Sequence, residues 1–193
     1  MEALQGRDPT LRCRFCLATV VAPGTLRRVQ RLPSEYWQEL CDFWVCHEDT
    51  KLPFSGSTID AMPQRCLVGE THVLLHADDV APGAVVTNAP TDSALQVVTC
   101  GRCSCPLGLC DGAAPSLRIH KDRLAAHTAA EDLFARYTPL SRVWSAAMER
   151  ARAHSQYRFL VHALDAGTVD AGKYMGVRAR ILLLNWTSTV RWR

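Results

Sequence analysis

The sequence predicts an α+β protein, built from short-stranded β hairpins and two packed amphipathic helices. Three observations support this fold class. Short apolar runs alternate with turn residues along most of the chain. Two segments repeat apolar residues at helical spacing, which indicates helices with one buried side. Two Cys-x-x-Cys motifs, each beside a predicted strand, offer metal ligands that could close the hairpins.

The first half of the chain is expected to open with a hairpin over residues 11–31, which turns at Pro23 and Gly24. A helix should follow, because Pro33 and Ser34 are typical of a helix start. Its buried stripe would be formed by Trp37, Leu40, Cys41, Trp44 and Val45. Further strand material is expected in residues 66–69, 71–76 and 80–86.

The second half is expected to contain strands at 94–98 and 117–124, separated by a loop at 105–112 that is rich in glycine, proline and cysteine. A second helix should begin at Thr138 and Pro139. Its apolar stripe consists of Leu140, Val143, Trp144, Ala147, Met148 and Ala151. Two late strands, 157–164 and 177–186, flank a turn.

We expect two domains. Residues 1–126 should form a β-rich module with one helix, clamped by its cysteines, and residues 127–193 a C-terminal helix with strands packed on it.

Composition limits the classes of partner. The chain of 193 residues carries 22 Lys and Arg against 19 Asp and Glu, and this net charge of +3 is too small to indicate direct binding of nucleic acid. No apolar run approaches the roughly 18 residues of a membrane span, so no membrane partner is expected. Residues 1–8 do not resemble a signal peptide, and we expect a cytoplasmic or nuclear location. Only three residues are lysine: Lys51, Lys121 and Lys173.

The nine cysteines carry the strongest chemical signal. In a chain without a secretion signal, clustered cysteines more often bind metal or react than form disulfides. Cys13-x-x-Cys16 and Cys100-x-x-Cys103 each place two thiolates on one tight knuckle, and two knuckles can complete a tetrahedral Zn²⁺ site. Such a site would tie two distant hairpins together.

Other interpretations of these cysteines remain open. A second ligand set keeps Cys13 and Cys16 but takes Cys46 and His47 in place of the second motif. The two motifs could also be unrelated buried thiols. A redox role is disfavoured, because neither motif begins a helix within a βαβ pattern.

Cys46 and His47 are also the candidate catalytic residues. A thiol beside an imidazole could act as a nucleophile or accept an acyl group as a thioester. The alternative is structural, with a buried cysteine at a helix end and a histidine that caps carbonyl groups. The chain has no GxGxxG, P-loop, HExxH or GxSxG motif, so ordinary cofactor and hydrolase chemistry is not indicated.

The order of the motifs resembles the HECT-like ubiquitin-conjugating-enzyme-binding proteins. The segments that carry the resemblance cover most of the chain and are, in order, Cys13-x-x-Cys16, Leu32-Pro33-Ser34-Glu35-x-Trp37, Trp44-Val45-Cys46-His47, Cys66-Leu67-Val68-Gly69-Glu70, Val98-Thr99-Cys100-x-x-Cys103, Leu107-Gly108, residues 139–144 and residues 181–185.

The resemblance implies ubiquitin-ligase-type activity through binding of a ubiquitin-conjugating enzyme, with ubiquitin as a second partner. It also implies a link to the machinery that cleaves and polyadenylates pre-mRNA. The paired hairpins are similar to the zinc-bound β-tent domains of the Yippee and cereblon type, which favours Cys13, Cys16, Cys100 and Cys103 as the Zn²⁺ ligands.

The resemblance leaves the chemistry of transfer open. No cysteine follows Cys110 in this sequence, so a HECT-style thioester near its C-terminal end is not expected. Cys46, with His47 beside it, is then the candidate for a covalent intermediate. Otherwise the protein would act as a scaffold that positions a charged conjugating enzyme. The alternative function is a non-catalytic, zinc-stabilised binding or assembly factor.

Overall fold

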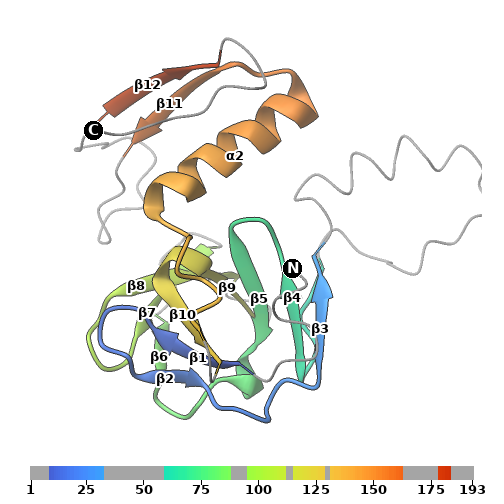
Figure 1. Cartoon of the computed structure of the whole chain (residues 1–193), viewed down its shortest axis with the longest axis vertical. Coiled ribbons are helices and arrows are strands. Elements are labelled where there is room, and N and C mark those ends of the chain that lie inside the picture. Colours follow the sequence, from blue (N-terminus) through green and yellow to red (C-terminus); the bar gives the residue numbers. More distant parts are fainter. Residues whose placement is uncertain are drawn as a thin grey trace, which may run out of the picture. The chain divides into compact units, whose positions relative to one another are not determined.

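The structure is a computed structural model that describes residues 9–32, 59–87, 95–111, 115–128, 131–162 and 178–183. The chain divides into two compact units, Met1–Thr138 and Pro139–Arg193, which we call the N-terminal and C-terminal units (Figure 1). In the part of the chain described, no helix is long and apolar enough to cross a membrane.

In its described residues, the N-terminal unit contains a sheet of three strands and a mixed sheet of seven. The smaller sheet has the order β10-β1-β2 and the larger one the order β3-β4-β5-β9-β8-β7-β6, in which only β3 and β4 are parallel. The strands are β1 (Thr10–Cys13), β2 (Thr19–Val21), β3 (Arg28–Arg31), β4 (Arg65–Val68), β5 (His72–His76), β6 (Val85–Thr87), β7 (Leu95–Cys100), β8 (Pro106–Asp111), β9 (Ser116–His120) and β10 (Leu124–His127).

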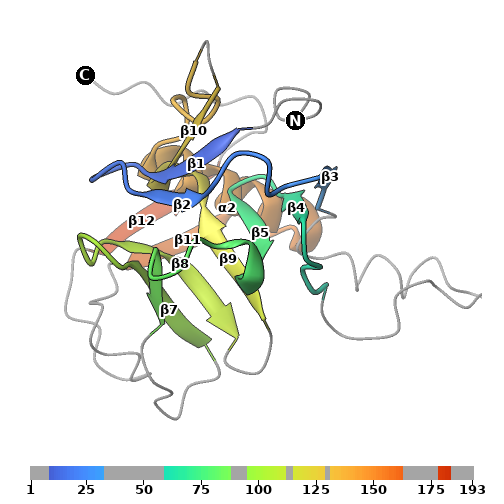
Figure 2. The same cartoon turned by 90° about the horizontal axis from the view of Figure 1, so that it is seen from below.

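Figure 2 shows the strands of both sheets, and side chains from both contribute to one apolar core. Leu11 of β1 and Val20 of β2 are buried together with Leu75 of β5 and Ile119 of β9. Burial of each such side chain stabilises the fold by about 1.5–3 kcal/mol. The core therefore joins β1, near the start of this unit's sequence, to β9, near its end.

The predicted fold class, α+β with two packed helices, is wrong for the residues described. Their regular elements are mostly strands, with α2 (Pro139–His154) as the one α-helix and two short 3-10 turns, η1 (Ala77–Asp79) and η2 (Lys121–Arg123). The helix expected from Pro33, with its stripe at 37–45, lies outside the described residues.

Part of the error lies in residues 105–112, for which the sequence predicts a loop. Most of them form β8, which pairs on one side with β7 and on the other with β9. Two neighbouring strands supply the hydrogen-bond partners here, and this pairing outweighs the turn preference of proline and glycine. A segment with turn-forming composition thus becomes a central strand.

Gly108 shows why β8 needs a glycine. It lies opposite Val98 of β7 and Ile119 of β9. A Cβ atom at this position would overlap the carbonyl oxygen of Arg118 and lie 2.8 Å from the Cα of Ile119. Both neighbours are backbone, so they cannot move without disturbing the ladder.

Gly108→Ala is therefore expected to destabilise the protein by about 3 kcal/mol, the upper end of the usual cost of overpacking. Urea denaturation measures this loss. Gly83→Ala is the control, because Gly83 has a φ of 70° but no atom within 4 Å of a Cβ placed there. It should cost only about 1 kcal/mol of backbone strain. Equal losses in the two variants would contradict this account of β8.

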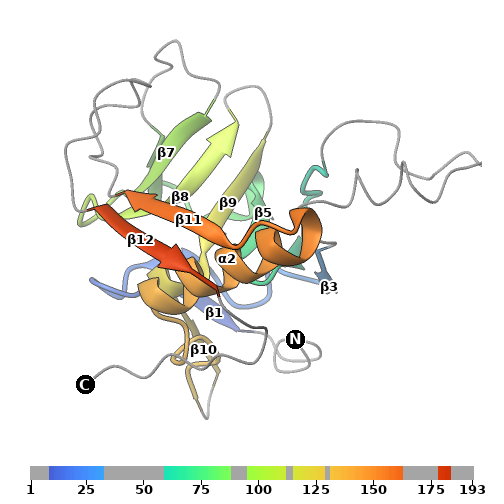
Figure 3. The same ribbon diagram turned by 90° about the horizontal axis from the view of Figure 1, so that it is seen from above.

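The described part of the C-terminal unit comprises α2 and an antiparallel pair of strands, β11 (Arg158–His162) and β12 (Arg178–Leu182) (Figure 3). The helix packs on one face of the hairpin through Trp144, Met148 and Ala151, which contact Phe159, Ile181 and Leu183. The helix predicted from Pro139 is thus present, with Ala147, Met148 and Ala151 buried and Leu140 exposed.

Candidate metal centre

Two turns of the N-terminal unit share one backbone pattern, and we call them the first and second knuckle. In the first, residues 13–18, the Cys13 N–H donates to the Ala18 carbonyl at 2.9 Å and the Leu17 N–H donates to the Cys13 carbonyl at 2.9 Å. In the second, residues 100–105, the Cys100 N–H donates to the Cys105 carbonyl at 2.9 Å and the Ser104 N–H to the Cys100 carbonyl at 2.8 Å.

The two knuckles also place their cysteines in the same way. Cys13 is the last residue of β1 and Cys100 the last residue of β7, so each strand delivers its first thiol to the turn directly. The second thiol, from Cys16 or Cys103, follows within the turn. Equal backbone geometry therefore presents two thiols from each knuckle on one side.

The residue after each second cysteine has a left-handed backbone. Leu17 has a φ of 58° and Ser104 a φ of 56°. Glycine adopts this conformation freely, whereas another residue loses roughly 1–2 kcal/mol. Because neither motif carries a glycine here, the sequence gives no signal of this strained position.

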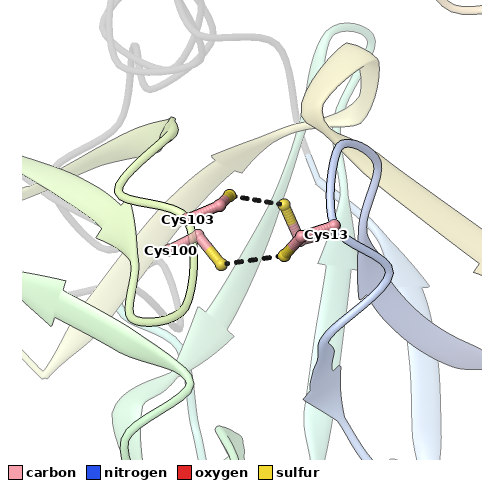
Figure 4. A group of neighbouring side chains, drawn as sticks. Cys13, Cys100 and Cys103 are labelled. Atoms are coloured by element: carbon pink, nitrogen blue, oxygen red, sulfur yellow. Dashed lines mark hydrogen bonds between the residues drawn. The ribbon is translucent and has the colours of Figure 1, made fainter.

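Four sulfur atoms meet between the knuckles, and all their Sγ atoms lie within 4.8 Å of one another. The Cys13 and Cys103 Sγ atoms are 3.7 Å apart, and those of Cys16 and Cys100 are 3.6 Å apart; Figure 4 shows Cys13, Cys100 and Cys103 turned toward a common centre. These separations are far too long for a disulfide, whose S–S bond is about 2.05 Å. A regular tetrahedron with Zn–S bonds of about 2.3 Å places its sulfurs about 3.8 Å apart.

The donor set therefore fits a metal ion and is consistent with zinc. Four cysteines are typical of structural Zn²⁺ sites, and a metal with four protein ligands has no open position for water or substrate. Cys13 and Cys100 are buried, Cys16 is half-buried and Cys103 is exposed. The arrangement suits a cross-link between two hairpins rather than a catalytic metal.

The two thiols of the first knuckle differ in pKa because their surroundings differ. Burial raises the pKa of Cys13 to about 12, against hydrogen bonds from the backbone of Cys16 and Phe15. A backbone hydrogen bond from Ala18 lowers the pKa of Cys16 to about 7, although some desolvation opposes it. Metal binding needs both as thiolates, so a bound cation would displace the Cys13 proton.

Arg14, inside the first Cys-x-x-Cys motif, anchors this knuckle to distant residues. Its Nη1 donates to the Oδ2 of Asp132 at 3.0 Å, and its Nη2 donates to the carbonyls of Leu124 at 2.6 Å and Phe134 at 2.8 Å. The Oδ1 of Asp132 in turn accepts the N–H groups of Ala126 and Phe134, both at 2.9 Å. Sequence reasoning missed this anchor, because the two residues lie 118 positions apart.

The other candidate residues have different surroundings. Cys46 and His47 lie outside the described residues, so the alternative ligand set and the catalytic role of this pair remain predictions. Cys105 supports the second knuckle through its carbonyl, while its thiol lies 3.8 Å from the Pro106 carbonyl. Cys66 and Cys110 are buried in the core, and desolvation raises the pKa of Cys66 to about 12.

Fold and site together define a β-rich protein with a four-cysteine centre that joins two hairpins. The chain belongs to the family of HECT-like ubiquitin-conjugating enzyme (E2)-binding proteins, which it matches over residues 1–188. This match confirms the resemblance that the order of its motifs indicates.

Relatives of the chain have low sequence identity to it. A human protein named as an E3 ubiquitin-protein ligase is 31% identical over 67 residues, 35% of this chain and 16% of its own length. The mouse protein of the same name is 28% identical over 108 residues, 55% of this chain and 27% of its own length. An uncharacterised protein of Saccharomyces cerevisiae is 25% identical over 128 residues, 64% and 35% of the two lengths.

The chain thus aligns with about a third or less of the length of these relatives. No solved structure matches it.

Proposed function

We propose that this protein binds a ubiquitin-conjugating enzyme and promotes the transfer of ubiquitin to a substrate, as a ubiquitin-ligase-type protein. The observation that carries the proposal is the family match over residues 1–188. Two relatives that are named as ubiquitin-protein ligases support it.

The second part of the proposal is that Cys13, Cys16, Cys100 and Cys103 hold one Zn²⁺. Their sulfur separations of 3.6–3.7 Å between the knuckles support this ligand set. When bound, the metal supplies a cross-link between β1 and β7, which lie in different sheets. The chain would then gain rate by holding a charged conjugating enzyme close to an acceptor, and not through its metal.

Discharge of ubiquitin from a panel of loaded conjugating enzymes tests this function. Free lysine is the acceptor of choice, because this chain has three lysines and one of them, Lys121, is buried and donates to the Glu70 carbonyl and the Tyr137 hydroxyl. Self-modification would therefore give a weak signal. We expect discharge from at least one enzyme to be faster with the folded protein than with buffer alone.

Cys46→Ala separates the two routes of transfer. Scaffolded transfer predicts that the variant discharges ubiquitin at the wild-type rate, whereas a covalent intermediate on Cys46 predicts complete loss in a folded protein. Binding of a conjugating enzyme without any acceleration would contradict the ligase function and support a non-catalytic assembly factor instead. A role with pre-mRNA 3′-end cleavage factors would then be sought by testing for a stable complex with them.

A further inference from the structure

The first knuckle exposes two large apolar side chains. Phe15 is 59% exposed and Leu17 is 54% exposed, and they flank Cys16. Among the described residues of the N-terminal unit, Met62 and Val86 are also large, apolar and exposed, but they lie far apart in the sequence, unlike Phe15 and Leu17. The first knuckle therefore presents two exposed apolar side chains within three residues of one turn.

The stability of the fold does not explain why residue 17 is a leucine. Its left-handed φ of 58° would be free of strain in glycine, and its exposed side chain gains little from burial. The corresponding residue of the second knuckle, Ser104, has the same backbone but a polar side chain. An apolar side chain that is both strained and exposed indicates a role outside the folding of the chain itself.

Two arginines border this apolar pair. The guanidinium carbon of Arg123, in η2, lies 5.4 Å from the centroid of the Phe15 ring. Arg102, from the second knuckle, donates from its Nη1 to the Cys16 carbonyl at 3.5 Å. Arg123 forms an ion pair with Asp122, with 3.3 Å between its Nε and the Oδ2, whereas Arg102 forms no ion pair with a described residue. The border is therefore positively charged, most clearly at Arg102.

We propose that Phe15, Leu17, Arg102 and Arg123, which we call the knuckle patch, dock the ubiquitin-conjugating enzyme. This inference rests on the proposed function and names the surface that carries it out. The partner would offer an apolar depression bordered by carboxylates, which complements an apolar centre with a guanidinium border. Aromatic and arginine side chains also dominate the binding energy of many protein interfaces.

The four cysteines make this surface possible. Residues 15 and 17 come from the first knuckle and residue 102 from the second, and the contacts between the thiols hold the two turns side by side. Metal bound there would keep the patch in one arrangement before the partner arrives. A preformed surface loses less conformational entropy on binding.

Leu17→Gly is the decisive variant, because it removes the apolar side chain and relieves the backbone strain at once. We expect it to fold at least as well as wild type, to keep the same metal content, and to bind the conjugating enzyme about tenfold more weakly or worse. Phe15→Ser should weaken binding by a similar factor. Isothermal titration calorimetry at physiological salt gives the dissociation constants, with the enzyme of the panel that binds wild type most tightly.

Two controls match these variants. Ser104→Gly relaxes the equivalent left-handed position without removing an apolar side chain, and Met62→Ser removes an exposed apolar side chain away from the knuckles. Both should bind as wild type does. Arg102→Glu should weaken binding and reduce its dependence on salt, because it reverses a charge at the border.

The outcomes separate the two proposals. If no enzyme of the panel binds wild type, the proposed function fails, and the docking proposal fails with it. If wild type binds and Leu17→Gly and Phe15→Ser bind equally well, the proposed function stands but the knuckle patch is not the docking surface. Loss of binding to ubiquitin alone, or loss of self-association, with an unchanged affinity for the conjugating enzyme would also overturn the assignment.

Discussion

Cys100→Ser should lose the bound Zn²⁺ and much of the stability of the N-terminal unit. Wild type is expected to carry one zinc per chain, because all four thiols lie within 4.8 Å of one another and two pairs lie at the separation of a tetrahedral site. Structural zinc contributes on the order of 10 kcal/mol in small modules, so loss of one ligand should lower the free energy of unfolding by several kcal/mol. Native mass spectrometry measures the zinc, and urea denaturation measures the stability.

Cys105→Ser is the matched control. Cys105 lies two residues beyond Cys103 but supports the second knuckle through its backbone, which accepts from the Cys100 N–H and hydrogen-bonds the Cys103 thiol, and serine retains both contacts. This variant should keep one zinc and nearly all of its stability. If Cys100→Ser instead keeps its zinc unchanged, the result favours the alternative ligand set of Cys13, Cys16, Cys46 and His47. If well-folded wild type carries no zinc, the metal site itself is wrong.

Arg14→Met should lower the free energy of unfolding by about 3 kcal/mol, although the residue binds no metal. The change removes three hydrogen bonds and leaves the Oδ2 of Asp132 and two carbonyl oxygens without this donor. Groups that lose a charged partner away from water cost about 3–5 kcal/mol, and partial exposure of 28% for Arg14 and 16% for Asp132 places this pair at the lower end. Urea denaturation measures the loss.

Arg28→Met is the control for the loss of an arginine. Arg28 is exposed on β3, so this change should stay within about 0.5 kcal/mol of wild type. A double-mutant cycle of Arg14→Met with Asp132→Asn should show coupling of about 1 kcal/mol or more. Strictly additive losses would mean that Arg14 and Asp132 act independently and that the anchor of the first knuckle is misassigned.

Patterns that repeat along the chain could be read correctly from the sequence. The helix from Pro139 is present because the proline at its first position and its apolar spacing act within a few turns. The four cysteines that lie together could be selected because Cys-x-x-Cys spacing sets the local geometry of two thiols. In both cases the information lies within a short stretch of residues.

Long-range contacts could not be read in this way. Residues 106–111 look like a loop in sequence, and only pairing with β7 and β9 makes them a strand. In the sequence, nothing distinguishes Arg14 from other residues inside a motif. Only its contact with the distant Asp132 in the folded chain shows that it anchors the first knuckle. Residue 17 has a left-handed backbone but is a leucine and not a glycine, so the sequence does not indicate this conformation.

The sequence by itself determined the family of the protein, the helix from Pro139 and the cysteine pairs of the candidate site. Only the tertiary structure decided that the two knuckles meet, that β8 is a central strand, and that Arg102 of the second knuckle reaches the Cys16 carbonyl of the first. The physical reason is the range of the forces involved. Spacing and capping act through neighbours in the chain, whereas strand pairing and core burial join residues that are far apart in it.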